Sequence, residues 1–440
     1  MNERMGKATR LCCALLLAVL LPACANIGLT LPSNEDLEAG VLVRVNEAGD
    51  RMVVIAVANP SESVPVLPGT TAGGYAGAPG YMAYGSARAT VAALEKDYHL
   101  HQVTAWPIVA LKVQCAVLEI DGAEPRDQVL ATIAKDRRVQ LVQPLQTFRT
   151  LGVALAYDPN YESLQRGLQE IDAPAAQRIS RGDDVRVAVI DTGLDTRHPD
   201  LAGRVVMTRD FVERDKTAFN RDIHGTAVAG IIAANQNNGH GVMGVAPGAK
   251  ILAFKACWQT PTADGAPDLN ASACNTLTLA KALVASIEAH AQVINLSLSG
   301  PPDPLLARLV DYALQRGTIV VGAVPPSGDL HAFPVGVANV IAADLPGSKV
   351  TDAVLRAPGR DVLTLKPGGH YDFFSGSSFS AAYVSGISAL LIAREPRLGA
   401  TGVYAALKSS ISGTDGEQTV NACVALYAIA AGACTTAMAE

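Results

Sequence analysis

Three residues whose types could together perform nucleophilic catalysis are widely spaced along the chain. Asp191 ends the apolar run "VRVAVID", and His224 lies 33 residues later in "DIHGTAVAG". Ser378 follows after a further 154 residues, in "SGSSFSAAYVSG". In a triad of this kind the carboxylate orients the imidazole, the imidazole takes the hydroxyl proton, and the serine oxygen attacks a carbonyl carbon. The sequence therefore predicts serine-hydrolase chemistry if the fold brings these three side chains together.

Each motif alone has a simpler interpretation. Asp-Thr-Gly is a common turn after a strand and also occurs in aspartic proteases, but those enzymes need two such carboxylates and this chain has one. His224 could merely begin a helix, and Ser378 could merely cap one. The order Asp, His, Ser is neither that of chymotrypsin-like enzymes nor that of α/β-hydrolases. An esterase is not supported, because no G-x-S-x-G elbow surrounds Ser378.

The segment after Ser378 predicts a helix buried on all sides. Between Phe379 and Ala393 the chain carries no charged residue, so the helix would have no polar face for water. Its first turn leaves unpaired N–H groups and a partial positive charge at Ser378. The backbone N–H of Ser378 is therefore the predicted donor to an oxyanion.

Short apolar runs alternate with helical patterns from residue 183 onward. The expected strands are Val185–Ile190, Lys250–Trp258, Val293–Leu298, Thr318–Val324 and Asn339–Ala343. Helical patterns separate them, including "HGTAVAGIIAAN", "LTLAKALVASIEAHA" and "PLLARLVDYALQRG". This alternation predicts an α/β fold with a parallel sheet covered by helices on both faces. Chemistry then belongs at the carboxyl ends of the strands, where Asp191 lies.

With these motifs the chain resembles the subtilisin-like serine proteases, or subtilases, from Tyr157 to about Leu407. "MGVAPGAKILAFK", "VINLSLSG" and the approach "DFFSGSSFSAA" are also similar to that family. The resemblance implies a subtilisin-like fold, serine endopeptidase activity on protein or peptide substrates, and Asp191, His224 and Ser378 as the triad. The usual Pro that ends the nucleophile motif is Ala382 here.

One departure from the family concerns the oxyanion hole. Subtilases normally place an Asn after the strand that here reads "TIVVGAVPPSGD", and Pro326 stands at its position. Proline offers neither a side-chain donor nor an N–H. A hydroxyl such as Ser327, a water or a rearranged loop could supply the bond, which would give a slow or narrowly specific protease. The alternative is a catalytically weak or inactive pseudoprotease that binds peptides in the cell envelope.

The resemblance also implies where a substrate would lie. Peptides would pair with an exposed strand edge formed by Leu296, Ser297, Leu298, Ser299 and Gly300. Val324 and Pro325 would wall the main specificity pocket, and because they are bulkier than the usual residues they predict a pocket for a small side chain.

A small domain is expected before the catalytic domain, which we place at residues 151–440. Residues 24–85 comprise a β-rich segment, "GVLVRVNEAGDRMVVIAVAN", and a Gly-rich linker. With a strand from that segment, residues 86–150 give the order β-α-β-β-α-β of a ferredoxin-like α+β domain. The resemblance implies a propeptide that inhibits its own enzyme and is removed by self-cleavage between about Gln146 and Tyr157. The simpler interpretation is a packing module.

The first residues predict export. Basic residues precede the apolar run Leu11–Leu21 and "PACAN", the pattern of a signal peptide spanning residues 1–23. "LPAC" resembles a bacterial lipobox, so Cys24 is the expected lipidated residue and the membrane the partner of its anchor. Cleavage after Ala25 with simple secretion is the alternative. The predicted location is the bacterial cell envelope, in the periplasm or at the outer membrane, or the exterior.

Cysteine spacing and net charge indicate which disulfides, metal sites and nucleic-acid partners to expect. The sequence-near pairs Cys257–Cys274 and Cys423–Cys434 could form disulfides in an oxidising compartment. No Cys spacing suits zinc, so no metal or other cofactor is expected. The loop Ala234–Val242 resembles one that binds calcium in many subtilases, but Asn235, Asn237 and Asn238 have no carboxylate beside them in that loop. A formal charge of −6 without a long basic run argues against nucleic acid as a partner.

Overall fold

The computed structural model describes the chain from residue 41 onward, with gaps. The described residues are 41, 44–45, 48–60, 85–151, 153–155, 164–212, 216–235, 241–261, 267–348, 351–413 and 418–429. They belong to one compact unit, Val41–Glu440. The predicted signal peptide, Cys24 and most of the Gly-rich linker lie outside the described residues. Among those residues, no helix has both the length and the apolar character needed to cross a membrane.

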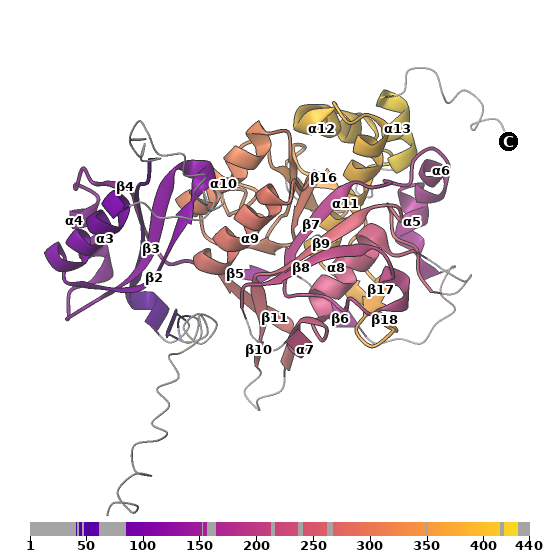
Figure 1. Ribbon diagram of the computed structural model, residues 1–440. Coiled ribbons are helices and arrows are strands. Elements are labelled where there is room, and N and C mark those ends of the chain that lie inside the picture. Colours follow the sequence, from indigo (N-terminus) through magenta and orange to yellow (C-terminus); the bar gives the residue numbers. More distant parts are fainter. Residues whose placement is uncertain are drawn as a thin grey trace, which may run out of the picture. The chain divides into compact units, whose positions relative to one another are not determined.

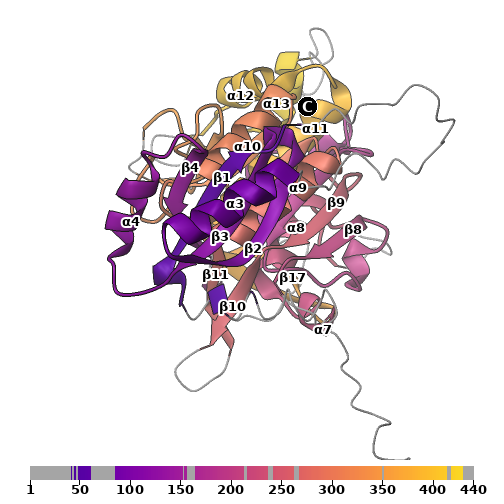
Figure 2. The same ribbon diagram turned by 60° about the vertical axis from the view of Figure 1, so that its left-hand side comes forward.

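The first described elements form a four-stranded antiparallel sheet with two helices (Figure 2). In chain order they are η1 (Gly49–Arg51), β1 (Met52–Ala58), α3 (Gly85–Asp97), β2 (Leu100–Ile108), η2 (Val109–Leu111), β3 (Val113–Ile120), α4 (Arg126–Ile133) and β4 (Val139–Pro144). The sheet order is β2-β3-β1-β4, and the element order is the β-α-β-β-α-β pattern that the sequence suggested. The strand expected before Glu47 is wrong, because the described residues between Val41 and Ala48 are helical.

Strand β1 is apolar throughout because both of its faces are buried. Val53, Ile55 and Val57 pack into a core shared with α3 and α4. Met52 and Val54 face the other way, into a core shared with α9 (Thr276–Glu288) and α10 (Pro304–Gln315). The alternation follows from the two-residue period of a strand. Through this second face the small domain is packed against the rest of the chain.

A seven-stranded parallel sheet forms the centre of the larger part (Figure 1). Its order is β16-β15-β14-β12-β7-β9-β8. The strands are β7 (Arg186–Asp191), β8 (Val205–Asp210), β9 (Lys250–Lys255), β12 (Val293–Leu296), β14 (Ile319–Ala323), β15 (Ile341–Asp344) and β16 (Leu355–Arg356). The predicted parallel α/β fold is confirmed. Strands β9 and β12 end earlier than expected, since the chain leaves the sheet at Ala256 and Ser297 to join an antiparallel one.

Helices cover both faces of this sheet. Helices α8 (Ile223–Ala233) and α11 (Ser377–Arg394) share a core with Val187, Val189 and Val321. Helices α9 and α10 pack on the other face, against Ala188 and Ile190. Helix α11 is buried from Ser377 to Ile392, as its lack of charge predicted. The remaining helices are α5 (Arg166–Glu170), α6 (Ala173–Gln177), η4 (Pro199–Leu201), α7 (Lys216–Phe219), α12 (Gly399–Ser409) and α13 (Ala422–Ile429).

Two small antiparallel sheets bring the segment after the small domain to the carboxyl ends of the parallel strands. The first has the order β10-β11-β5-β13 and the second β17-β18-β6. Their strands are β5 (Thr147–Thr150), β6 (Val153–Leu155), β10 (Cys257–Pro261), β11 (Pro267–Asn275), β13 (Leu298–Ser299), β17 (Val362–Lys366) and β18 (His370–Ser375). The first sheet pairs β5, before position 151, with the larger part of the chain, and the second sheet does the same for β6, just after that position.

Candidate active site

Asp191 and His224 meet at the carboxyl end of the parallel sheet. Asp191 is the last residue of β7, and His224 is the second residue of α8. The imidazole Nδ1 lies 2.8 Å from Asp191 Oδ1 and 2.9 Å from Oδ2. Both side chains are buried, and His224 Nε2 is a buried ring atom without a hydrogen-bond partner. The arrangement holds one imidazole nitrogen on a carboxylate and leaves the other available to accept a proton.

Two glycines allow the helix start to approach the strand end so closely. A Cβ atom at Gly225 would collide with the carbonyl oxygen of Gly193 and lie 3.3 Å from Asp191 Cβ. Gly193 itself has a φ of 112°, a conformation that other residues rarely adopt. The glycines of Asp-Thr-Gly and His-Gly-Thr are thus needed to seat α8 on the turn after β7.

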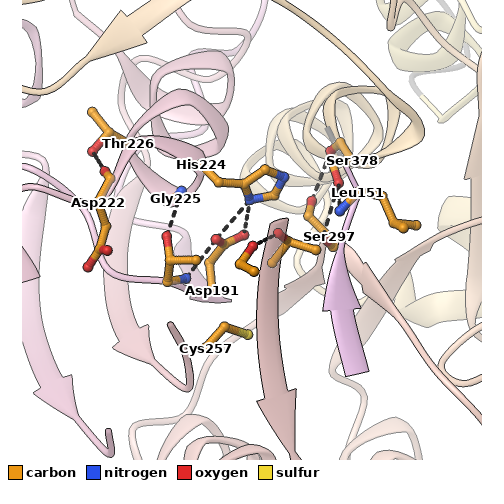
Figure 3. A network of polar contacts seen from close by, with 12 residues as sticks. Leu151, Asp191, Asp222, His224, Gly225, Thr226, Cys257, Ser297 and Ser378 are labelled. Atoms are coloured by element: carbon orange, nitrogen blue, oxygen red, sulfur yellow. Dashed lines mark hydrogen bonds and ion pairs between the residues drawn. The ribbon is translucent and has the colours of Figure 1, made fainter. Parts of the chain in front are cut away.

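Ser378 lies in the first turn of α11, on the side of His224 away from Asp191 (Figure 3). Its hydroxyl donates to the carbonyl oxygen of Ser297 at 3.0 Å and accepts from the N–H of Leu151 at 3.1 Å. The side chain is fully buried beneath this segment. The nucleophile candidate is therefore in contact with Leu151, the residue that directly follows the small domain.

A hydrogen-bonded chain that the sequence did not reveal anchors α11 to β12. Ser297 Oγ donates to the carbonyl of Ser378, and Asn295 Nδ2 donates to Ser297 Oγ, both at 2.8 Å. Ser385 Oγ donates to Asn295 Oδ1 at 2.9 Å. Buried polar groups need such partners. The polar residues of the apolar helix thus fix where Ser378 lies relative to the sheet.

Strand β5, which precedes Leu151 in the chain, lies between β11 and β13. Phe148 pairs with Cys274 and Arg149 with Ala273 on β11, while Arg149 and Thr150 pair with Ser299 and Leu298 on β13. Exposure alternates along β5, so that Phe148 and Thr150 point inward and Arg149 points outward. The hydroxyl of Thr150 also bonds that of Ser272. The segment is held on both edges through its backbone, as an extended peptide would be.

Strand β6 continues this path on the other side of Ser378. Val153, Ala154 and Leu155 pair with Ser375, Phe374 and Phe373 of β18, the strand that leads into α11. Gly152 lies outside the described residues. Residues 147–150 and 153–155 therefore pair with the protein on either side of Leu151, whose N–H donates to the Ser378 hydroxyl.

The candidate substrate-pairing residues only partly contact residues 147–151 and Ser378. Ser297, Leu298 and Ser299 contact the segment or Ser378, and Gly300 faces the Phe148 ring so closely that a Cβ there would collide with it. Leu296 does not belong to the pairing edge. It is a buried residue of β12 paired with Gly322, because the parallel sheet still includes it.

The loop after β14 offers no obvious replacement for the missing Asn. Pro326 is exposed, and Ser327 is exposed with its Oγ accepting the N–H of Asp329 at 3.3 Å. Val324 is buried, and its carbonyl accepts the hydroxyl of Ser377 at 2.7 Å. The first-turn N–H groups of α11, including that of Ser378, are the backbone donors that this helix start offers.

One of the two candidate disulfides is formed. Cys257 and Cys274 are bridged, which ties the start of β10 to the strand that pairs with Phe148. Cys423 is a buried free thiol, so the second bridge is not present, and Cys434 lies outside the described residues. Cys115, in the small domain, is also free, and burial raises the pKa of its thiol to about 12.

The Asn-rich loop has an unexpected carboxylate neighbour. Asn237 and Asn238 lie outside the described residues. At the loop's described ends, the Asp200 carboxylate accepts the N–H of Val242 at 2.9 Å and the Asp200 carbonyl accepts that of Asn235 at 2.8 Å. Within the described part of the chain, no three His, Cys, Asp or Glu side chains are grouped as metal ligands.

Comparison with known proteins gives the family. Residues 182–424 match the subtilase family. The chain is 35% identical to thermitase of Thermoactinomyces vulgaris over 58% of its own length and 92% of that protein. It is 32% identical to the thermophilic serine proteinase of Bacillus sp. (strain AK1), over 64% of its own length and 69% of that protein. The chain belongs to the subtilase family.

The fold comparison agrees with this family. The subtilase resembles the crystal structure of fervidolysin from Fervidobacterium pennivorans, a keratinolytic enzyme related to subtilisin, with a TM-score of 0.64 and 22% identity. The match covers 85% of this chain and 60% of fervidolysin. The subtilase is accordingly a subtilisin-like serine endopeptidase, a hydrolase that acts on protein or peptide substrates.

Proposed function

We propose that this subtilase is made as a precursor that cuts its own chain after Leu151, using Asp191, His224 and Ser378. The observation that carries the proposal is the path of residues 147–155, which pair with β11 and β13 before Ser378 and with β18 after it. A peptide bound on both sides of a serine hydroxyl has the geometry of a substrate. The path passes the Ser378 hydroxyl at Leu151, so the peptide bond after Leu151 is the proposed scissile bond.

The chemistry follows from the contacts of each side chain. Asp191 fixes the imidazole through Nδ1, so Nε2 is the atom that accepts the Ser378 proton. Ser378 must first turn away from the Ser297 carbonyl. Its oxygen then bonds the Leu151 carbonyl carbon, the imidazolium returns the proton to the departing amine, and water attacks the acyl-enzyme in a second, equivalent cycle.

The oxyanion would be held by the Ser378 N–H and the positive end of α11. The absence of a side-chain donor at Pro326 should slow turnover, by about 10²–10³-fold relative to a complete oxyanion hole. Self-cleavage tolerates such a loss, because the substrate is tethered and already lies in place.

The small domain would inhibit the enzyme until it leaves. Its tail, strand β5, pairs with β11, and its sheet shares a core with α9 and α10. Gln143 Oε1 accepts the N–H of Leu305 at the start of α10, at 2.9 Å, and the Gln146 carbonyl accepts that of Thr276 at the start of α9, at 3.1 Å. These contacts stabilise the bound state of the tail, as an inhibitor requires.

The same segment suggests a substrate preference. A leucine, rather than a small residue, contacts Ser378, and it packs half-buried against the core. We therefore favour peptides with a medium-sized apolar residue before the cut over the small residue expected from Val324 and Pro325. Export with a lipid anchor at Cys24, in the cell envelope, rests on the sequence pattern alone.

A binding protein without activity is the second candidate, and Pro326 is the observation that favours it. The test is a peptide with the sequence of residues 147–155, incubated with the purified protein and analysed by mass spectrometry. An endopeptidase should release the product ending in Leu151, and Ser378→Ala and His224→Ala should release none. Saturable binding of the intact peptide by wild type, without product, would favour the binding protein.

A further inference from the structure

A buried lysine that no part of the proposed mechanism uses lies directly beside the Asp191–His224 pair. Lys255 is the last residue of β9 and pairs in register with Asp191 of the neighbouring parallel strand β7. Residues paired in this way project to the same face of the sheet. The Lys255 side chain is 1% exposed. A buried ammonium group is costly unless it is paired and hydrogen-bonded, so its partners indicate what it does.

The partners of Lys255 belong to the two segments that carry the proposed triad's acid and base. Its Nζ lies 2.6 Å from Asp222 Oδ2 and donates to the carbonyl oxygen of Thr192 at 2.6 Å. Asp222 is the N-cap residue of α8, two positions before His224. Thr192 follows Asp191 and donates its N–H to Asp191 Oδ1 at 2.7 Å. One ammonium group thus joins the turn after β7 to the start of α8.

The carboxylate of Asp222 is itself confined against that turn. A Cβ at Gly193 would lie 2.5 Å from Asp222 Oδ2, and the Asp222 side chain is 7% exposed. Figure 3 shows Asp222 at the start of the helix that carries His224, with its carboxylate directed away from the imidazole. The ion pair therefore cannot move into water without separating the helix start from the turn.

We infer that Lys255 and Asp222 form a positioning pair that sets the charge balance around His224, a role that rests on the proposed proteolytic function. Asp191 bonds the imidazole directly, while Asp222 lies two residues before His224 with its carboxylate against the turn after Asp191, and Lys255 neutralises Asp222. The imidazole then exchanges its proton next to one net negative charge rather than two. Lys255 touches no substrate and acts through Asp222 and Thr192.

Other charged groups around the start of α8 form a constant background. They are Asp195 in the loop after β7, Asp210 on β8, Arg221 before α8, and Lys366 on β17, which is paired with Asp372 of β18 at 2.8 Å. Helix α11 contributes no charged residue between Ser377 and Ala393. Since none of these is altered in the test, any shift reports the Lys255–Asp222 pair.

Opposite shifts are expected when each partner is removed singly. In Lys255→Met the ammonium no longer neutralises the Asp222 carboxylate, which should favour the imidazolium, so the His224 ring should titrate at higher pH, by about one unit. In Asp222→Asn the unpaired ammonium should favour the neutral ring, and titration should move to lower pH by about the same amount. In the double variant the pH at which His224 titrates should return close to the wild-type value. A merely structural role would not reverse the sign between the two single variants.

The measurement is NMR of histidine-labelled precursor carrying Ser378→Ala, followed over a pH series. It needs no enzymatic activity, so it stands even if the proposed proteolysis fails. His224→Gln identifies the resonance. Lys250→Met and Asp184→Asn serve as matched controls, because that pair lies at the opposite end of β9, 4.0 Å apart and partly exposed, and should leave the resonance unmoved.

If the enzyme is active, the acidic limb of the kcat/KM profile should shift in the same directions. Single-variant shifts in the same direction, or no shift in either, would overturn the inference. If Lys255→Met does not fold, Asp222→Asn and the charge-conserving Lys255→Arg decide the matter. Asp222→Asn should lower the pH at which the His224 resonance titrates, and Lys255→Arg should leave that pH unchanged. Any other pattern contradicts the inference.

Discussion

The contact between Phe148 and Gly300 predicts a strong preference for an aromatic residue four positions before the cut. Phe148 is fully buried, and its ring meets Phe333 edge-on with centroids 5.4 Å apart. Gly300 lies against the ring, where a Cβ would collide with it. In a free peptide, a phenylalanine at this position should fill the same space once the small domain has left.

The size of the effect follows from burial. Fully burying a phenylalanine side chain contributes about 1.5–3 kcal/mol, which is about 10- to 150-fold in kcat/KM if it is gained in the transition state. The assay compares the p-nitroanilides of Phe-Arg-Thr-Leu and Ala-Arg-Thr-Leu with the processed enzyme. Wild type should prefer the first by that factor.

Gly300→Ala should remove most of this preference, because the added methyl group occupies the space of the ring. Its ratio of the two kcat/KM values should fall to about three or less, while cleavage of the alanine peptide changes little. His331→Ala, at an exposed residue of the same loop as Phe333, should retain the wild-type ratio. Equal cleavage of both peptides by wild type, or an unchanged ratio in Gly300→Ala, would refute the assignment of the Phe148 site.

Three further outcomes are expected. Asp191→Asn should slow precursor processing about 10⁴-fold, measured as loss of full-length chain, because the imidazole would adopt the wrong tautomer; an effect under tenfold would contradict the triad. Burial raises the pKa of Asp303, so its contribution to stability is present at low pH and lost as pH rises past the ordinary carboxyl value of about 4. Asp303→Asn in the Ser378→Ala precursor should therefore flatten the pH dependence of the unfolding free energy above that value, and an unchanged dependence would count against it. Replacing Cys257 and Cys274 by serine should lower the unfolding free energy by about 3 kcal/mol in chemical denaturation and abolish sensitivity to reductant.

Much of the fold could be predicted because its signals are local. The apolar interior of strands such as β7 (Arg186–Asp191) and the uncharged stretch after Ser378 show burial directly in the sequence. The glycines of Asp-Thr-Gly and His-Gly-Thr indicate close approaches of the backbone, and Gly193 and Gly225 lie where the start of α8 meets the turn after β7. The positions of Asp191, His224 and Ser378 follow from such strand and helix ends, where a parallel sheet collects its functional residues.

What could not be predicted depends on pairings between distant residues. A lysine at the end of an apolar strand, Lys255, gives no indication of its partner 33 positions earlier. Asp200 contacts the Asn-rich loop although the loop itself contains no carboxylate. Val41 to Ala48 has the apolar composition of a strand, yet its described residues are helical, with Val45 packed into the core that also includes α9 and α10. Tertiary packing overrides local propensity in that case.

The intact mass and N-terminal sequence of the purified protein test the central claim most directly, with wild type compared with Ser378→Ala. The account predicts that wild type begins at Gly152 and that the variant still carries the residues up to Leu151. If both keep the small domain, or if wild type is cut outside residues 147–155, the path of that segment across Ser378 is not that of a substrate, and the proposed self-cleavage is wrong.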